Sequence, residues 1–156
     1  NDAFLKSFVS VHNKFAENKE DNEPINILLS TGNIESKGKF LESTILLKSL
    51  GHKLYASPGT ANFLLDNNIP VETLHWPLEK KEPNIITYLL NKKIDLVINI
   101  PKNNLREELE NDYTIRRTTA DLEIPLITNL QVAMQMVESL EYIKNHPFEI
   151  KHWGEY

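Results

Sequence analysis

The stretch IDLVINI, residues Ile94–Ile100, is the most apolar strand-like segment of the chain and decides its fold class. Short apolar runs of this length, rich in branched residues and followed by proline, are typical of buried strands. Asn99 is an exception near the end of the run, because a polar side chain in such a strand usually has a hydrogen-bond partner. We therefore predict a buried strand here and treat Asn99 as a candidate functional residue.

Strands and helices alternate on both sides of this strand. The apolar patterns predict further strands at Ile25–Leu29, at Lys53–Ala56, from Ile69 to Val71 and at Ile124–Ile127. They predict helices at Ser36–Leu50, Ala61–Asn67, Asn84–Asn91, Asp112–Leu122 and Asn129–Ile143. Strands that alternate with helices at this spacing imply right-handed βαβ crossovers and a parallel sheet covered on both faces. The fold class is therefore α/β, with three layers and about five strands.

The amino-terminal residues are expected to form a separate segment. Residues 3–16 carry apolar positions close to helical spacing, and the polar stretch 17–23 follows before Pro24. We predict a helical lead-in and linker over residues 1–24 and one α/β domain over residues 25–156. The first residue is Asn and not Met, so we expect the sequence to be part of a longer chain.

The composition excludes several classes of function. The chain has no cysteine, which excludes a disulfide scaffold, a thiolate metal site and a cysteine nucleophile. The net charge of −5 disfavours general nucleic-acid binding, which needs a basic surface. No apolar run approaches the ~20 residues that cross a bilayer. The sequence shows no phosphate-loop, dinucleotide-binding or nucleophile-elbow motif, and its histidines lack a metal-binding spacing.

In an open parallel sheet, ligands bind beyond the carboxyl ends of the strands. The loops that meet this description are residues 30–38, 57–60, 75–83 and 99–112. The turn Ser57-Pro58-Gly59-Thr60 opens a helix, where free N–H groups and the positive end of the helix dipole suit a phosphate or carboxylate. Lys37 from a neighbouring loop would match the charge, and Trp76 would pack on a ring or acyl chain.

Each of these residues also has a purely structural interpretation. Thr60 taken alone is equally well explained as a helix N-cap, and Trp76 as part of an ordinary surface patch. Lys37 and Lys39 are also explained as a solvated helix face. The pair Arg116-Arg117 suits either an anion or acidic partners that tie the preceding loop to its helix. The convergence of the loops on one sheet edge favours a binding site.

Four segments carry a resemblance to a known family. They are LYASPGTANFLLDNNIPV (54–71), LHWP (74–77), KIDLVINIPKNN (93–104) and NDYTIRRTTADLEIPLITNLQV (111–132). In order and spacing they resemble the carboxyl-terminal regulatory domain of eukaryotic carbamoyl-phosphate synthetases, which has the methylglyoxal-synthase-like fold. The resemblance covers residues 25–156 and implies a five-stranded parallel sheet with the order 3-2-1-4-5.

The resemblance also implies an effector site and a set of effectors. Synthetases of the urea-cycle type bind N-acetyl-L-glutamate, and by position their ligand set matches Ser57, Thr60, Trp76 and Asn99, while Lys102 and Asp112 stand where they have asparagines. The turn ASPGTA is nearer to the pyrimidine-pathway synthetases, which respond to UMP or UTP and to phosphoribosyl pyrophosphate. In bacterial relatives a lysine at the position of Lys37 contacts nucleotide phosphate. The expected effector site is therefore Lys37, Ser57, Thr60, Trp76, Asn99, Lys102 and Asp112.

We expect an allosteric domain that is itself non-catalytic and holds no cofactor. The complete enzyme implied by the resemblance makes carbamoyl phosphate with ATP and Mg or Mn on other domains, in the cytoplasm or the mitochondrial matrix. The expected partners are the effector, those synthetase domains and a second copy of the chain, without nucleic acid or membrane. The alternatives are a free-standing methylglyoxal synthase, although the loop with Glu79 and Glu82 lacks the glycines of that enzyme, and a non-binding oligomerisation module.

Overall fold

A single parallel sheet lies at the centre of the computed structural model, which describes residues 24–101 and 106–145, with only the backbone of residues 106–108 and 143. The strands are β1 (Asn26–Thr31), β2 (Lys53–Ala56), β3 (Glu72–Thr73), β4 (Leu96–Ile100) and β5 (Leu126–Ile127). They pair in the order β3-β2-β1-β4-β5, and every pairing is parallel. The predicted fold class and strand order are confirmed.

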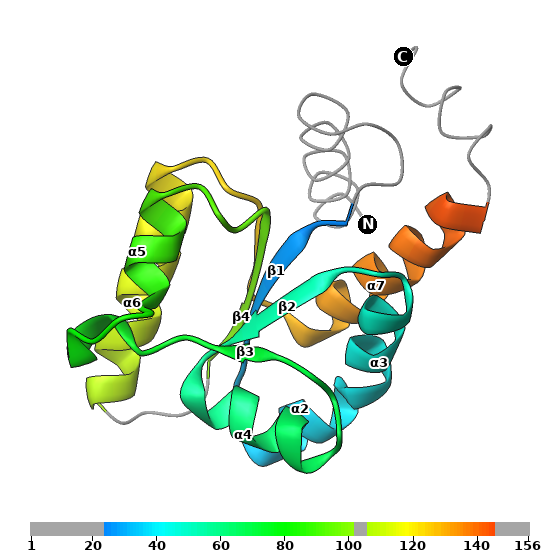
Figure 1. Ribbon diagram of the computed structural model, residues 1–156, viewed down its shortest axis with the longest axis horizontal. Helices are drawn as coiled ribbons and strands as arrows, with labels where there is room; N and C mark the ends of the chain where they lie inside the picture. The colour runs from blue at the N-terminus through cyan, green and yellow to red at the C-terminus, as the bar shows by residue number, and fades with distance from the viewer. Residues whose placement is uncertain (1–23, 102–105, 146–156) are drawn as a thin grey trace.

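Helices cover both faces of the sheet. Their bounds are α2 (Ile34–Lys39), α3 (Leu41–Ser49), α4 (Pro58–Asp66), α5 (Ile85–Leu90), α6 (Arg106–Asp121) and α7 (Leu130–Asn145), with a short 3₁₀ helix η1 (Pro77–Glu79). Figure 1 shows α5 and α6 together on one face, and α2, α3, α4 and α7 on the other. Among the described residues, no helix is both long and apolar enough to span a membrane.

Successive residues of each strand supply two separate cores. In β1, Ile27 and Leu29 pack with α3, α4 and α7, whereas Leu28 between them packs with α5 and α6. In β4, Val97 belongs to the second core and its neighbour Ile98 to the first. Side chains of a strand point alternately to its two faces, so a strand buried on both faces must be apolar at nearly every position. This explains the continuous apolar run that identified β4.

Several predicted boundaries differ from the structure, including the start of α4 at Pro58 instead of Ala61, and three of them have a clear local reason. The predicted helix over 36–50 is two helices that meet at Phe40, whose buried side chain lies at the turn between them. The third strand begins at Glu72 instead of Ile69, because Pro70 has no N–H to give to a sheet ladder. Helix α6 begins at Arg106 instead of Asp112, because its first residues are polar but good helix formers. The predicted lead-in helix over 3–16 and most of its linker lie outside the described residues.

Candidate anion-binding site

The carboxyl ends of β1, β2 and β4 meet at one edge of the sheet, and α4 begins there directly after β2. Ser57 is the N-cap residue of α4 in an extended conformation, and Pro58 occupies the first turn. Proline suits that position because its missing N–H has no partner in a helix anyway. The side chain of Ser57 makes no capping hydrogen bond, so the first N–H groups of α4 are left for another acceptor. Thr60 lies inside the helix, and its interpretation as the N-cap is wrong.

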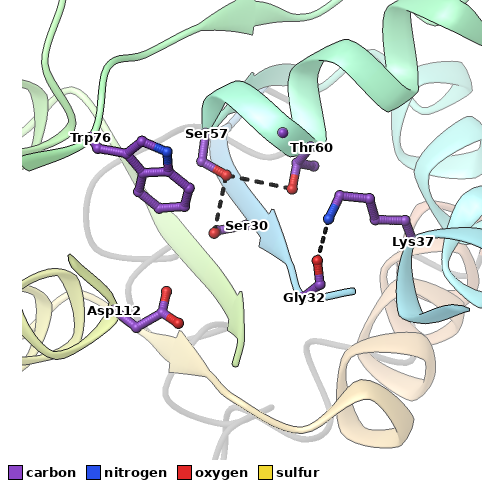
Figure 2. Close-up of a pocket in the computed structure, with 8 residues that line it drawn as sticks. Ser30, Gly32, Lys37, Ser57, Thr60, Trp76 and Asp112 are labelled. Carbon is purple, nitrogen blue, oxygen red and sulfur yellow. Dashed lines mark hydrogen bonds between the residues drawn. The ribbon is translucent and has the colours of Figure 1, made fainter. Parts of the chain in front are cut away.

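Three buried hydroxyl groups form a connected cluster at this edge. The Oγ of Ser57 donates to the Oγ of Ser30 at 3.0 Å and lies 3.4 Å from the Oγ1 of Thr60. Thr60 Oγ1 also accepts from the backbone N–H of Thr31 at 3.1 Å. Figure 2 shows the three hydroxyls together between the start of α4 and the end of β1. The sequence pattern identified Ser57 and Thr60 but not Ser30, which lies in the apolar strand β1.

Lys37 extends from α2 into the same pocket. Its side chain is buried, and its Nζ donates to the carbonyl oxygen of Gly32. Gly32 has a φ of +65°, and a Cβ there would lie 3.1 Å from the carbonyl oxygen of Pro101. Only glycine takes this conformation and this close approach without strain. The ammonium group of Lys37 thus lies beside the tight turn that follows β1.

Lys39 lies outside the pocket although it is two residues away. Its side chain is 58% exposed, and its Nζ contacts Glu35 at 2.9 Å. The hydrogen bond from Lys39 lowers the pKa of Glu35. Of the two lysines that the sequence offers, Lys37 faces the pocket and Lys39 faces solvent.

Trp76 and Asp112 form the opposite side of the pocket. Among the described residues, the lining consists of Ser30, Gly32, Lys37, Ser57, Gly59, Thr60, Trp76 and Asp112. These residues come from segments far apart in the sequence, and Figure 2 shows them around one space. The volume that the centre of a water molecule can occupy is only about 10 Å³, roughly room for one water. The side chains are thus gathered closely around a small space.

Asn99 lies directly beneath this lining. It pairs with Ser30 across β1 and β4, and its Nδ2 donates to the Oδ1 of Asp112 at 3.1 Å. The side chain is fully buried, and its Oδ1 has no hydrogen-bond partner among the described residues. The sequence prediction that Asn99 has a polar partner is confirmed. Asn99 is not itself part of the lining, and Lys102 lies outside the described residues.

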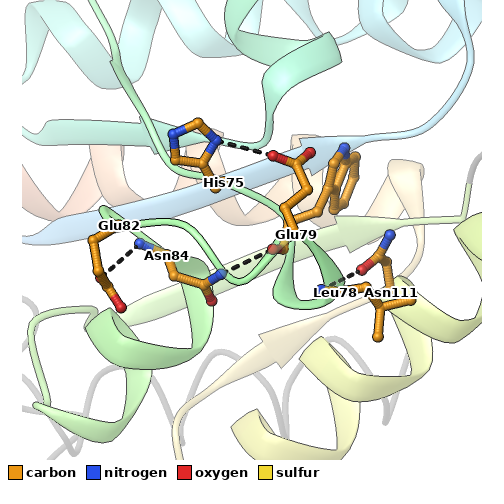
Figure 3. A network of polar contacts seen from close by, with 7 residues as sticks. His75, Leu78, Glu79, Glu82, Asn84 and Asn111 are labelled. Atoms are coloured by element: carbon orange, nitrogen blue, oxygen red, sulfur yellow. Dashed lines mark hydrogen bonds and ion pairs between the residues drawn. The ribbon is translucent and has the colours of Figure 1, made fainter.

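Two buried asparagines hold the Trp76 wall in place. Asn84, the N-cap of α5, donates from its Nδ2 to the carbonyl oxygen of Trp76 at 2.9 Å. Asn111 accepts from the backbone N–H of Leu78 at 3.1 Å. Figure 3 shows Asn84 and Asn111 on either side of the segment that carries Leu78 and Glu79. Sequence reasoning missed both residues, because an isolated Asn in a polar segment gives no signal of what it contacts.

The acidic residues of this loop are engaged outside the pocket. Glu79 Oε2 lies 3.0 Å from His75 Nδ1, and Glu82 accepts from the hydroxyl of Thr87 at 2.6 Å. Figure 3 shows the contact between His75 and Glu79, and neither Glu79 nor Glu82 is among the described residues that line the pocket. Within the described ranges no group of His, Asp and Glu side chains could hold a metal ion.

Arg117 makes its contacts within α6. It donates to the hydroxyl of Tyr113 at 3.0 Å, and its Nε lies 3.9 Å from Asp121. The hydrogen bond with Tyr113 and the charge of Asp121 raise the pKa of Arg117. Neither Arg117 nor the partly buried Arg116 lines the pocket. Among the described residues, these partners of Arg117 lie one turn away on the same helix.

Comparisons with known proteins place this geometry in a family. The family model described as the MGS-like domain matches residues 39–128. Multifunctional protein pyr1-3 of Dictyostelium discoideum is 35% identical over 158 residues, which cover 97% of this chain and 7% of that protein. The carbamoyl phosphate synthase large chain of Thermoplasma acidophilum is 33% identical over 120 residues, covering 77% of this chain and 11% of that protein.

A third relative is named as a mitochondrial enzyme. The mitochondrial carbamoyl-phosphate synthase (ammonia) of Homo sapiens is 36% identical over 107 residues, which cover 66% of this chain and 7% of that protein. The chain therefore spans only 7% to 11% of the length of these three relatives. The resemblance seen in the sequence, the sheet order and the family model agree, and the chain belongs to the MGS-like domain family.

Proposed function

We propose that this chain is the effector-binding domain of a longer carbamoyl-phosphate synthetase and that it binds a small anion. The observation that carries the proposal is the pocket at the carboxyl edge of the sheet, into which Lys37, Ser57 and Thr60 converge with Trp76 as a wall. A cation, hydroxyl donors and the uncapped start of α4 are the groups that bind a phosphate or carboxylate in proteins. The relatives carry the printed names of carbamoyl-phosphate synthases or of multifunctional proteins.

The effector would regulate the synthetase if it bound two conformations of that enzyme with different affinities. An effector that binds one conformation of the synthetase better than another shifts the population toward that conformation. A coupling free energy of about 1–3 kcal/mol is typical of such systems. The complete enzyme would make carbamoyl phosphate from bicarbonate, glutamine or ammonia, and ATP with Mg or Mn, on domains outside this chain. On this proposal the sites for ATP and the metal lie on those other domains.

The pathway and the cellular compartment of the longer protein are also part of the proposal. The multifunctional relatives favour pyrimidine synthesis and a cytoplasmic enzyme, whereas the mitochondrial relative favours the matrix. The candidate effectors are UMP, UTP, phosphoribosyl pyrophosphate and N-acetyl-L-glutamate. Each carries at least one phosphate or carboxylate that suits the Lys37 side of the pocket.

Calorimetric titration of the chain with these four compounds tests the proposal. We expect at least one to bind, and we expect Lys37→Met to weaken that binding by about tenfold or more, the factor that loss of one charge-assisted hydrogen bond brings. Lys39→Met is the matched control, because it removes a lysine from the same helix outside the pocket, and it should change the affinity less than about twofold. Equal effects of the two substitutions would place the anion elsewhere.

A phosphate assay and the same calorimetric titration separate the two alternative functions. A methylglyoxal synthase would release phosphate from dihydroxyacetone phosphate, which a phosphate assay detects directly. A module that only mediates oligomer contacts would bind none of the compounds. The pairing of Glu79 with His75 and of Glu82 with Thr87 favours binding over catalysis, since these carboxylates are engaged outside the pocket.

A further inference from the structure

Trp76 is the one aromatic side chain among the described residues that line the pocket. It is half-buried and packs against the core between the sheet and helices α5 and α6. Figure 2 shows its indole on one side of the hydroxyl cluster and Lys37 on the other. The flat face of an indole suits a planar ring, so the direction of this side chain decides what the pocket accepts beside the anion.

The backbone of Trp76 is fixed on both sides of its Cα. The carbonyl oxygen of His75 accepts from the N–H of Ile85 at 3.1 Å. The carbonyl oxygen of Trp76 accepts from the N–H of Glu79 at 3.1 Å and from the Nδ2 of Asn84 at 2.9 Å. Because peptide units are planar, two fixed carbonyls set the φ and ψ of Trp76 and with them the direction of its Cβ. Only rotations within the side chain remain, and packing against the core restricts them.

Of these three donors, only Asn84 uses a side chain. Asn84 is 5% exposed, and its Oδ1 accepts from the N–H of Ile86 at 2.9 Å as the N-cap of α5. If the amide were turned over, its oxygen would face the carbonyl of Trp76 and its NH₂ would face an N–H, and both pairs would repel. One amide therefore caps α5 and holds Trp76 at the same time, and a substitution can separate the two roles.

We propose that Asn84 is a positioning residue that holds the Trp76 indole as a fixed wall, so that the pocket selects anions joined to a flat ring. The anionic group lies against the start of α4, and the ring stacks on the indole. An indole that is already fixed loses little conformational freedom when a ligand arrives, so more of the stacking energy remains as affinity. The inference rests on the proposed function, since it requires that the pocket binds an anion.

The expected ligand class is accordingly a nucleotide or another phosphate that carries an aromatic ring. Among the candidate effectors, UMP and UTP belong to this class, whereas phosphoribosyl pyrophosphate and N-acetyl-L-glutamate have no aromatic ring. The donors at the start of α4 do not make this distinction, because every candidate has a phosphate or a carboxylate. The distinction comes from Trp76 and from the residue that holds it.

The fluorescence of Trp76 tests the positioning without a ligand. The chain has two tryptophans, so Trp153→Phe leaves Trp76 as the only one. In that background Asn84→Ser keeps a good N-cap residue and removes the amide that donates to Trp76. We expect the emission maximum to move to longer wavelength and quenching by acrylamide to increase, because a less restricted indole meets more water.

Asn129→Ser is the matched control for this substitution. Asn129 is exposed before α7, and its Oδ1 accepts from the N–H of Val132 at 3.1 Å. The same change therefore alters a helix cap outside the pocket lining, and the fluorescence of Trp76 should stay that of the parent. Circular dichroism checks that each variant is folded. Asn84→Asp, which also keeps the cap and removes the donor, replaces Asn84→Ser if the latter does not fold.

A pair of ligands that differ only by a ring tests the selection. UMP and ribose 5-phosphate share the ribose and the phosphate, but only UMP carries the uracil ring. Calorimetric titration of each should show that the chain prefers UMP by about tenfold or more, the effect of stacking one base on an aromatic side chain. In Asn84→Ser the ratio of the two affinities should fall to within about threefold, because the indole must then be ordered by the ligand. In Asn129→Ser the ratio should stay that of the wild type.

The outcomes separate the inference from the proposed function. If the chain binds phosphate or any candidate effector but does not prefer UMP to ribose 5-phosphate, the selection of a ring is refuted while the anion site stands. If Asn84→Ser keeps the ratio or leaves the fluorescence of Trp76 unchanged, the role of Asn84 is refuted. If the chain binds neither of the two ligands, nor phosphate, nor any candidate effector, the proposed function is refuted and the inference with it. A ratio and a fluorescence that change in Asn84→Ser and not in Asn129→Ser support the inference.

Discussion

Replacing Thr60 by valine tests whether the hydroxyl cluster holds the end of β1. Valine has the shape of threonine and nearly the same helix propensity, so the change removes a hydroxyl and little else. Thr60 is 2% exposed, and its Oγ1 accepts from the N–H of Thr31 at 3.1 Å. After the substitution that N–H is buried without an acceptor. A buried donor left unpaired costs about 1–3 kcal/mol, which is the expected loss in the free energy of unfolding.

Urea unfolding followed by far-ultraviolet circular dichroism measures this loss. For a chain of this size, each kcal/mol also lowers the melting temperature by about 2–4 °C. Thr114→Val is the matched control, because the hydroxyl of Thr114 donates to the exposed carbonyl of Glu110, which water can satisfy. We expect that control to stay within about 0.5 kcal/mol of the wild type. Equal losses in the two variants would refute the assignment of Thr60 as a structural acceptor.

Three further predictions concern stability. Gly32→Ala should lower the free energy of unfolding, measured with urea, by about 1–2 kcal/mol, because Gly32 has a φ of +65°. Gly38→Ala is its control, because a Cβ at Gly38 meets nothing within 4 Å. That control should be neutral or stabilising by up to about 1 kcal/mol. Asn111→Ala should cost about 0.5–1.5 kcal/mol in the same assay, because the N–H of Leu78 loses its acceptor. Burial raises the pKa of Tyr88 above its ordinary value of 10.0. The free energy of unfolding should therefore fall as the pH rises above 10.0, because the tyrosine ionises more readily in the unfolded chain. Urea midpoints measured over this rise in pH should fall less for Tyr88→Phe than for the wild type.

The α/β fold class followed from the sequence because the central strands left a strong pattern, whereas the strand order came from the family resemblance. Residues 94–100 and 25–29 are apolar nearly throughout, as strands buried on two faces must be, and the chain between them alternates with helices. The boundary of α6 was missed for the opposite reason. Its first turns carry mostly charged residues in the sequence, so no apolar period marked where the helix begins.

The sequence predicted only part of the candidate site, and the residues that it missed all make contacts between distant segments. Ser57 and Thr60 were found because a hydroxyl-rich turn before a helix has a known use. Ser30 was missed because its role depends on a register partner and on a turn from another strand. Asn111 was missed because its contact joins segments 33 residues apart. Such long-range contacts are a property of the fold and leave no trace in the local sequence.

The small volume of the pocket links the binding of a ligand to the movement of the side chains that line it. With about 10 Å³ of enclosed volume, the pocket would bind a whole effector only after side chains such as Lys37 and Ser57, which now contact Gly32 and Ser30, move apart. The free energy of that opening is subtracted from every binding energy, so the measured affinity reports how often the pocket opens as well as what it contacts. Substitutions in α2 or α4 that make this opening easier or harder would then change the affinity for the effector, although the substituted residues need not contact it.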